Sequence, residues 1–329
     1  TYKLAPEEQE RLAEVLQTGN YRPTRVPYTR VSVRTPDCTI NLYTSGKCVV
    51  QGKGAEDFVM FVLEPLVLQQ AGLGYEEVLD PQIMEPHIGV DESGKGDFFG
   101  PLVIAAAYVD ADLVQRLRDM NVRDSKSIKS DDKAKAMGRE LREALEGRFS
   151  VVRIGPAAYN RLYAKMRNVN TLLGWGHARA IENVLERVPG CPRALSDQFG
   201  RKDQVARALM KNGRRIKLEQ RPRAETDPAV AAASILAREA FLRSLKHIGS
   251  EEGVELLKGA SAAVRETAVE LVRKKGPPVL LKTAKCHFRT ADAVLEEAGY
   301  KRADVGPEAE AVSKAAGGGA RFKRPRPSS

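Results

Sequence analysis

The most informative stretch of this sequence is Val90-Asp91-Glu92-Ser93-Gly94-Lys95-Gly96-Asp97-Phe98-Phe99-Gly100-Pro101. The apolar residues 88–90 before it and 102–107 after it are typical of neighbouring buried strands. Asp91 and Glu92 therefore lie where one of these strands ends. Carboxylates at a buried strand end are unfavourable unless a cation binds them. The stretch predicts a cation site at a sheet edge.

A lysine between two glycines follows these carboxylates, in Gly94-Lys95-Gly96. Glycines allow a backbone to approach a phosphate closely, and the lysine adds positive charge. Carboxylates, a cation and a phosphate site together indicate phosphodiester chemistry. Two divalent ions can activate a water and stabilise the leaving oxygen in such a reaction. Mg²⁺ prefers oxygen ligands, so further carboxylates are expected elsewhere in the chain.

Two later segments supply candidate carboxylates. Asp197 follows the short run Ala194-Leu195-Ser196 and is therefore expected at a second strand end. Glu225 and Asp227 precede a predicted helix over residues 228–247. Asp227 stands before Pro228, the pattern of a helix N-cap with proline at the first helical position. Glu225 is therefore the better ligand candidate, although Asp227 stays open as the fourth carboxylate.

The string DESGKGDFFGPLVIAA, residues 91–106, resembles the opening motif of the type 2 ribonucleases H, and its GKGDFFGP part is more similar to ribonuclease HIII than to ribonuclease HII. Arg223-Ala224-Glu225 before AVAAASI resembles a second element of that family. Here Arg replaces the usual Lys and the spacing is one residue shorter than expected. The fourth ligand therefore depends on a less regular match.

The resemblance implies a ribonuclease H catalytic domain that hydrolyses the RNA strand of RNA/DNA hybrids by a two-metal-ion mechanism. The products would carry 5′-phosphate and 3′-hydroxyl ends. Mg²⁺ or Mn²⁺ is the implied cofactor. The implied catalytic and metal-binding residues are Asp91, Glu92, Asp197 and Glu225.

The resemblance also implies two substrate-binding elements. Gly94, Lys95 and Gly96 would contact the ribose 2′-hydroxyl, the group that distinguishes RNA from DNA. Ser125 and Lys126 belong to a segment that resembles the family's DSK motif and would hold a phosphate. His177 lies on a predicted helix over 170–188, where Asn170 is a candidate N-cap. A lone histidine there is more often packed than catalytic, and a metal mechanism needs no histidine base.

The first part of the chain predicts a small α+β domain. Its expected elements are helices over 6–18 and 55–71 and strands over 28–34, 38–43 and 47–51. Residues 22–53 are basic and contain interleaved tyrosines, a mixture that suits a nucleic-acid backbone. Residues 42–58 resemble the N-terminal domain of ribonuclease HIII. That domain is similar to a half-repeat of the TATA-binding protein and binds the hybrid.

The predicted fold class is α/β, a ribonuclease H-like mixed sheet flanked by helices, preceded by the small α+β domain. Its strands are expected near 88–92, 101–109, 149–155, 193–197 and 215–219. The domain boundaries that we predict are 1–72 for the TATA-binding-protein-like substrate-binding domain, 73–86 for a linker, 87–300 for the catalytic domain and 301–329 for a disordered basic tail.

Composition limits the remaining possibilities. The net charge of +10 suits a polyanionic partner. No apolar run approaches a membrane span and no signal-peptide core begins the chain, so we expect a cytoplasmic protein without membrane contact. The four cysteines form no CxxC pair, which argues against zinc and disulfides. A monomer is expected.

Two alternatives to hydrolysis of RNA/DNA hybrids stay open. They are ribonuclease HII-like incision at single ribonucleotides in DNA, and hybrid binding without catalysis.

Overall fold

The computed structural model describes residues 1–68, 81–122, 128, 130–197, 203–221 and 224–312. The chain divides into two compact units, Thr1–Met84 and Glu85–Ser329. Most of the predicted linker lies outside the described residues, and its end forms the short turn η2, Pro81–Met84. No helix within the described ranges is both long and apolar enough to span a bilayer.

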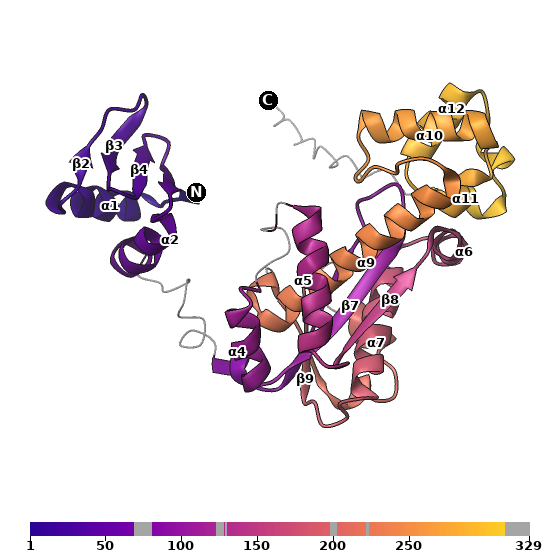
Figure 1. The fold of residues 1–329 in the computed structure, drawn as a ribbon, viewed down its shortest axis with the longest axis horizontal. Coiled ribbons are helices and arrows are strands. Elements are labelled where there is room, and N and C mark those ends of the chain that lie inside the picture. The colour runs from indigo at the N-terminus through magenta and orange to yellow at the C-terminus, as the bar shows by residue number, and fades with distance from the viewer. Residues whose placement is uncertain (69–80, 123–127, 129, 198–202, 222–223, 313–329) are drawn as a thin grey trace, which may run out of the picture. The chain divides into compact units, whose positions relative to one another are not determined.

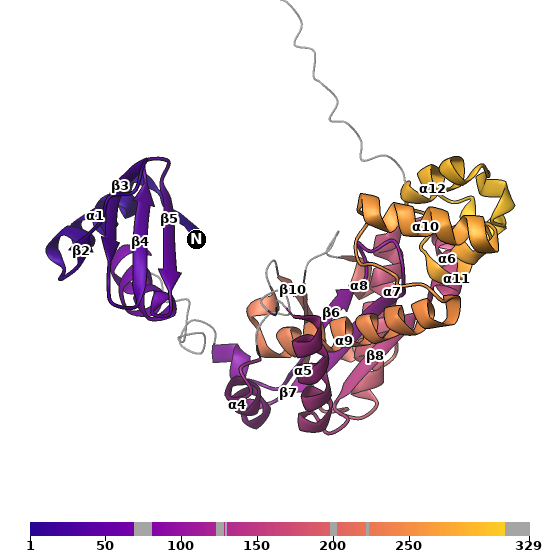
Figure 2. The same cartoon turned by 45° about the horizontal axis from the view of Figure 1, so that its top comes forward.

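The N-terminal unit contains an antiparallel sheet with the strand order β1-β5-β4-β3-β2 (Figure 2). Its described strands are β1 Tyr2–Lys3, β2 Arg22–Pro23, β3 Thr29–Arg34, β4 Cys38–Tyr43 and β5 Lys47–Gly52. Alternation along the strands sends one set of side chains to a buried face and the other to an open face. Ile40 and Leu42 lie on the buried face.

Helices cover that buried face. They are α1 Pro6–Thr18, α2 Ala55–Phe58 and the wider π-type helix η1 Val59–Leu68. Leu12 and Leu16 of α1 pack with Leu63 of η1 and with the buried face of the sheet. The unit therefore has its own hydrophobic core, as the predicted α+β domain requires.

The second unit contains a mixed sheet with the order β10-β9-β6-β7-β8. Its described strands are β6 His87–Ser93, β7 Leu102–Val109, β8 Phe149–Ile154, β9 Arg193–Asp197 and β10 Lys217–Arg221. Strands β6, β9 and β10 are parallel, whereas β7 is antiparallel to both of its neighbours. The described helices are α4 Ala111–Asp119, α5 Asp131–Ala144, α6 Pro156–Met166, α7 Val169–Leu185, α8 Asp203–Ala208, α9 Pro228–Glu252, α10 Ala262–Lys275, α11 Val279–Thr283 and α12 Thr290–Ala298. The short turns are η4 Gly213–Arg215, η5 Ala224–Thr226, η6 Arg302–Asp304 and η7 Pro307–Ala309.

Helices α7 and α9 cover opposite faces of this sheet. Figure 1 shows α9 running along the sheet with α5 beside it. A Cβ atom on Gly89 would lie 2.2 Å from the backbone of Ala229 in α9, so glycine permits this close packing. A Cβ atom on Gly176 of α7 would meet the side chain of Ile104 in β7. The predicted mixed sheet flanked by helices is confirmed.

The ends of two helices test the predicted capping residues. Asp227 caps α9, because its side chain accepts hydrogen bonds from the backbone N–H groups of Ala229 and Val230. The prediction of Asn170 as the cap of α7 is wrong. Asn168 takes that position and accepts from the N–H groups of Asn170 and Thr171, so the cap lies two residues earlier than predicted.

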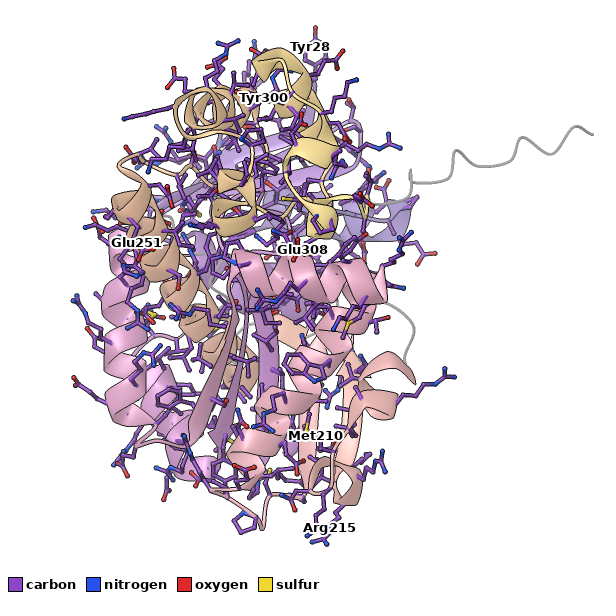
Figure 3. The ribbon with its side chains drawn as sticks, turned by 90° about the vertical axis from the view of Figure 1, so that its right-hand side faces the viewer. Tyr28, Met210, Arg215, Glu251, Tyr300 and Glu308 are labelled. Atoms are coloured by element: carbon purple, nitrogen blue, oxygen red, sulfur yellow. The ribbon has the colours of Figure 1, made fainter. Side chains whose placement is uncertain are left out.

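The C-terminal part of the described structure is packed up to residue 312. Val305 and Ala309 are buried, and Figure 3 shows the neighbouring Tyr300 and Glu308 on this helical part of the chain. The prediction of disorder is therefore wrong for residues 301–312. Residues 313–329 lie outside the described residues.

Candidate active site

A pocket lies where the carboxyl ends of the parallel strands β6 and β9 meet. It has a volume of about 410 Å³. It is lined by Asp91, Glu92, Ser93, Gly94, Lys95, Gly96, Asp197, Ser234 and Arg238. Val90 is paired with Ser196 in the parallel register, so the next residues, Asp91 and Asp197, follow at the same edge of the sheet. The pocket therefore gathers three of the four predicted carboxylates and the glycine-lysine-glycine loop.

Asp91 lies on the face of β6 that α9 covers. Its carboxylate accepts a hydrogen bond of 2.8 Å from the N–H of Glu92 and another from the hydroxyl of Ser234 in α9. Burial and, to a smaller extent, the neighbouring Glu92 carboxylate together raise the pKa of Asp91 to about 7, although these two hydrogen bonds oppose the shift. The two hydrogen bonds therefore do not offset the cost of burying the negative charge of Asp91, and a bound cation would stabilise that charge.

Glu92 lies on the opposite face of β6, under α7. It is paired with Ile104, the residue that meets Gly176 of α7. Strand β6 continues to Ser93, so Glu92 belongs to the strand instead of lying free at its exit as the sequence suggested. Burial opposes the ionisation of Glu92, but hydrogen bonds and positive charge from His177 and Lys95 outweigh it and lower the pKa of Glu92.

His177 connects the two acidic strands. Its Nε2 lies 3.1 Å from Oε2 of Glu92, and its Nδ1 lies 3.0 Å from Oγ of Ser196, the residue before Asp197. The side chain is fully buried. The expectation of a packed histidine is correct, but its packing also orients Glu92. Sequence reasoning did not identify this contact.

Fewer contacts are described for the two remaining carboxylates, Asp197 and Glu225. Oδ1 of Asp197 accepts a 3.4 Å hydrogen bond from the N–H of Ala224, so the segment that carries Glu225 begins beside Asp197. The backbone of Glu225 forms part of η5, and its side chain lies outside the described part of the structure. Among the described side chains, no three His, Cys, Asp or Glu groups form a ready cluster for one ion. The donor set nevertheless consists of oxygen atoms, as Mg²⁺ or Mn²⁺ requires.

The glycine-lysine-glycine loop forms one wall of the pocket. Gly94 has a φ of +87°, and a Cβ there would lie 2.3 Å from the carbonyl oxygen of Pro101. Gly96 has no atom within 4 Å of its Cβ position. Nζ of Lys95 lies 3.4 Å from Oε1 of Glu92. Gly94 is therefore required by the fold of the loop, whereas Gly96 leaves open space for a ligand.

We expect alanine at these two glycines to have different effects. Gly94→Ala forces a strained backbone and a clash, so it should cost about 1–3 kcal/mol of stability and reduce cleavage. Gly96→Ala should leave the melting temperature unchanged and weaken only the binding of substrate. Thermal unfolding and steady-state cleavage measured on both variants check this. A Gly94→Ala variant as stable as the parent would contradict it.

Ser125 and Lys126, the predicted phosphate ligands, lie outside the described residues. The structure does describe what flanks them. Arg238 of α9, which lines the pocket, donates to the carbonyl of Ile128 at 2.8 Å and to Asp131 at 2.9 Å. Ile128 and the start of α5 are therefore tied to the wall of the pocket.

Comparison with known proteins agrees with this geometry. The ribonuclease HII family model matches residues 88–291, and a domain of unknown function (DUF3378) matches residues 1–66. Ribonuclease HIII of Protochlamydia amoebophila is 41% identical over 291 residues, which cover 88% of this chain and 94% of that protein. Ribonuclease HIII of Chlamydia pneumoniae is 40% identical over 288 residues, with 87% and 94% covered.

A solved structure is similar over nearly the same length. The crystal structure of Bst-RNase HIII in complex with Mn²⁺ matches with a TM-score of 0.63 and 28% identity, covering 90% of this chain and 98% of that chain. These matches extend over both units of this chain, since each covers 87% or more of it. The chain therefore belongs to the ribonuclease HII family and, within it, to the ribonuclease HIII group.

Proposed function

We propose that this protein is a metal-dependent endoribonuclease that hydrolyses the RNA strand of RNA/DNA hybrids. The observation that carries the proposal is the pocket in which Asp91, Glu92 and Asp197 face a glycine-rich loop. Carboxylates from two parallel strands form a binding site for divalent cations, and the loop offers backbone groups to a nucleotide. Family membership supports the same reaction.

We assign the metal ligands as Asp91, Glu92, Asp197 and Glu225, with Mg²⁺ or Mn²⁺ as the ion. When bound, two such ions lower the pKa of a water and neutralise charge on the phosphate. The Mn²⁺ complex of Bst-RNase HIII supports this choice of cofactor. Hydrolysis in line with the leaving 3′-oxygen gives 5′-phosphate and 3′-hydroxyl ends.

The residues of this chain orient the reacting groups. Ser234 and the N–H of Glu92 hold Asp91 from one face of the sheet, and His177 holds Glu92 from the other. Gly94, Lys95 and Gly96 would contact the ribose next to the cut, and Ser125 and Lys126 a phosphate of the same strand. Selection for RNA then rests on the 2′-hydroxyl.

The N-terminal unit would bind the hybrid through the open face of its sheet. Arg22 and Arg34 are exposed and lie opposite each other on β2 and β3, so both project from one face. Two residues of the predicted basic and aromatic surface have other partners. Arg30 pairs with Glu10 of α1, and Tyr21 packs edge-on against Phe58.

We expect the double variant Arg22→Gln/Arg34→Gln to weaken hybrid binding at every sequence, because arginine–phosphate contacts release counterions. The slope of log affinity against log salt should fall by about one for each arginine that contacts a phosphate. Fluorescence titrations from low to moderate salt measure this slope. Arg30→Gln is the matched control, since Glu10 already pairs with Arg30. An unchanged slope in the double variant would remove the proposed binding face.

A cleavage assay with four substrates tests the function itself. The enzyme should cut a long RNA/DNA hybrid in Mg²⁺ or Mn²⁺ and leave double-stranded RNA and double-stranded DNA intact. A DNA duplex with a single ribonucleotide tests the ribonuclease HII-like alternative and should be cut poorly. Binding of the hybrid without any cutting, in either metal, would instead favour the non-catalytic alternative.

We further propose a monomer that acts in the cytoplasm. Asp91, Glu92 and Asp197 of a single chain line the pocket together, which is compatible with an active monomer. All four cysteines are buried free thiols, as suits a reducing compartment. Sedimentation of the purified protein checks the oligomeric state.

A further inference from the structure

We propose that Lys285 is a positioning residue for the ribose-sensing loop, and that the segment around it sets the selectivity of the enzyme for RNA. This inference rests on the proposed function and deepens it. Lys285 lies far along the chain from the loop, between α11 and α12. It contacts no metal-binding candidate and acts through the backbone that follows Gly96.

The ammonium group of Lys285 is fully buried against three carbonyl groups of one turn. Its Nζ donates to the carbonyl oxygens of Asp97 at 2.8 Å, Phe99 at 3.2 Å and Gly100 at 2.9 Å. An ammonium group has three N–H donors, so three acceptors match it completely. The three carbonyls therefore converge on one side chain that fixes the turn in a single conformation.

The same turn is also held through its backbone. The N–H of Phe98 donates to Gly259 and that of Gly100 donates to Thr283, while the N–H of Lys285 donates to the carbonyl of Phe98. The partners in these bonds lie roughly 150 residues or more from the turn in the sequence. Lys285 thus belongs to a support that holds residues 97–100 from outside the central sheet.

The turn held by Lys285 leads directly to the loop that lines the pocket. The N–H of Asp97 donates to the carbonyl of Gly94 at 3.4 Å, and Gly94 lies against the carbonyl of Pro101. The two ends of the stretch 94–101 therefore contact each other. A shift of residues 97–100 should therefore move Gly94 and the groups beside it, because Asp97 donates to the carbonyl of Gly94 and Pro101 lies against it.

Removing the ammonium group of Lys285 from water costs free energy, so a lysine at this buried position argues for a specific role. Burial lowers the pKa of Lys285 to about 7, and the nearby Asp97 carboxylate opposes the shift. The three carbonyl acceptors favour the protonated form. An apolar residue of similar length would fill the same space without any cost of desolvation, but it would leave the three carbonyls without this donor.

The test compares Lys285→Met with wild type and with Glu182→Gln. Glu182 is a buried carboxylate that accepts from the N–H groups of Asn212 and Gly213 and lies outside the pocket lining, so its variant controls for loss of stability alone. Each protein is assayed well below its melting temperature. Substrates are a hybrid and the same hybrid with one 2′-deoxy nucleotide next to the preferred cut.

We expect Lys285→Met to raise KM for the hybrid about tenfold and to reduce the preference for the ribose over the 2′-deoxy substrate about tenfold, as loss of roughly one hydrogen bond would do. The kcat should fall less. Glu182→Gln should keep both values. If Lys285→Met does not fold, Lys285→Gln, which retains two donors, should show an intermediate loss of selectivity.

This design distinguishes failure of the proposed function from failure of the positioning role of Lys285. Wild-type protein that fails to cut the hybrid at all would reject the proposed function, and the inference with it. Wild-type cleavage together with a Lys285 variant that is destabilised but keeps its KM and ribose preference within twofold would reject only the positioning role. Lys285 would then be a structural residue of the C-terminal part.

Discussion

Asp91→Asn should abolish hybrid cleavage while hybrid binding persists. The variant keeps the size of the side chain and its hydrogen bond from Ser234 or Glu92, but it removes the negative charge that a divalent ion requires. Loss of several kcal/mol of transition-state stabilisation corresponds to a decrease of at least about a thousandfold in kcat. Single-turnover cleavage measures the chemical step, and a filter-binding titration measures affinity for the hybrid.

The same variant makes a second prediction about metal binding. Mn²⁺ should raise the melting temperature of the wild type, because a ligand that binds only the folded state stabilises it. In Asp91→Asn the increase should largely disappear. Glu182→Gln, which alters a buried carboxylate outside the pocket lining, serves as the control and should keep both cleavage and the metal-dependent increase. An Asp91→Asn enzyme that cut at a normal rate would remove Asp91 from the catalytic centre.

His177→Ala should reduce kcat about 10- to 100-fold, the usual cost of removing a partner that orients a metal ligand. The variant leaves Glu92 buried without its hydrogen bond from α7. Its carboxylate would then turn toward Lys95, which already lies 3.4 Å from Oε1. A higher metal concentration should recover part of the rate, because the defect lies in the geometry of the ligand.

The conservative variant His177→Gln distinguishes orientation from simple packing. Glutamine retains an N–H donor near Glu92 and should restore more activity than alanine does. Melting temperatures measured without metal report the loss of packing separately. Equal activity of the alanine variant and the wild type across all metal concentrations would show that Glu92 needs no support from His177.

The sequence predicted the elements of the fold well because their signals are local. The alternation and apolar runs around β6, β7 and β9 indicate buried strands, and Asp227-Pro228 indicates the start of α9. The same reasoning predicted that Asp91 and Asp197 lie at one edge of the sheet, since each directly follows an apolar run, although β6 continues past Asp91 to Ser93. Carboxylates that directly follow an apolar run in the sequence can be predicted in this way.

The contacts between distant segments were not predictable in this way. His177 lies in the middle of a helix, and its approach to Glu92 depends on which face of the sheet α7 covers. Lys285 meets the turn after Gly96 only because the C-terminal segment folds back onto it. Neither residue has a spacing or a neighbour in the sequence that indicates its partner, and both depend on the tertiary arrangement.

The placement of Asp91 and Glu92 on opposite sides of one strand has a practical consequence for protein engineering. Although the two residues are consecutive, substitutions in α9 would change the surroundings of Asp91, and substitutions in α7 would change those of Glu92. Libraries built separately on these helices should adjust the environment of each carboxylate independently. A shift in the preference between a smaller and a larger ion could then be selected without altering either carboxylate.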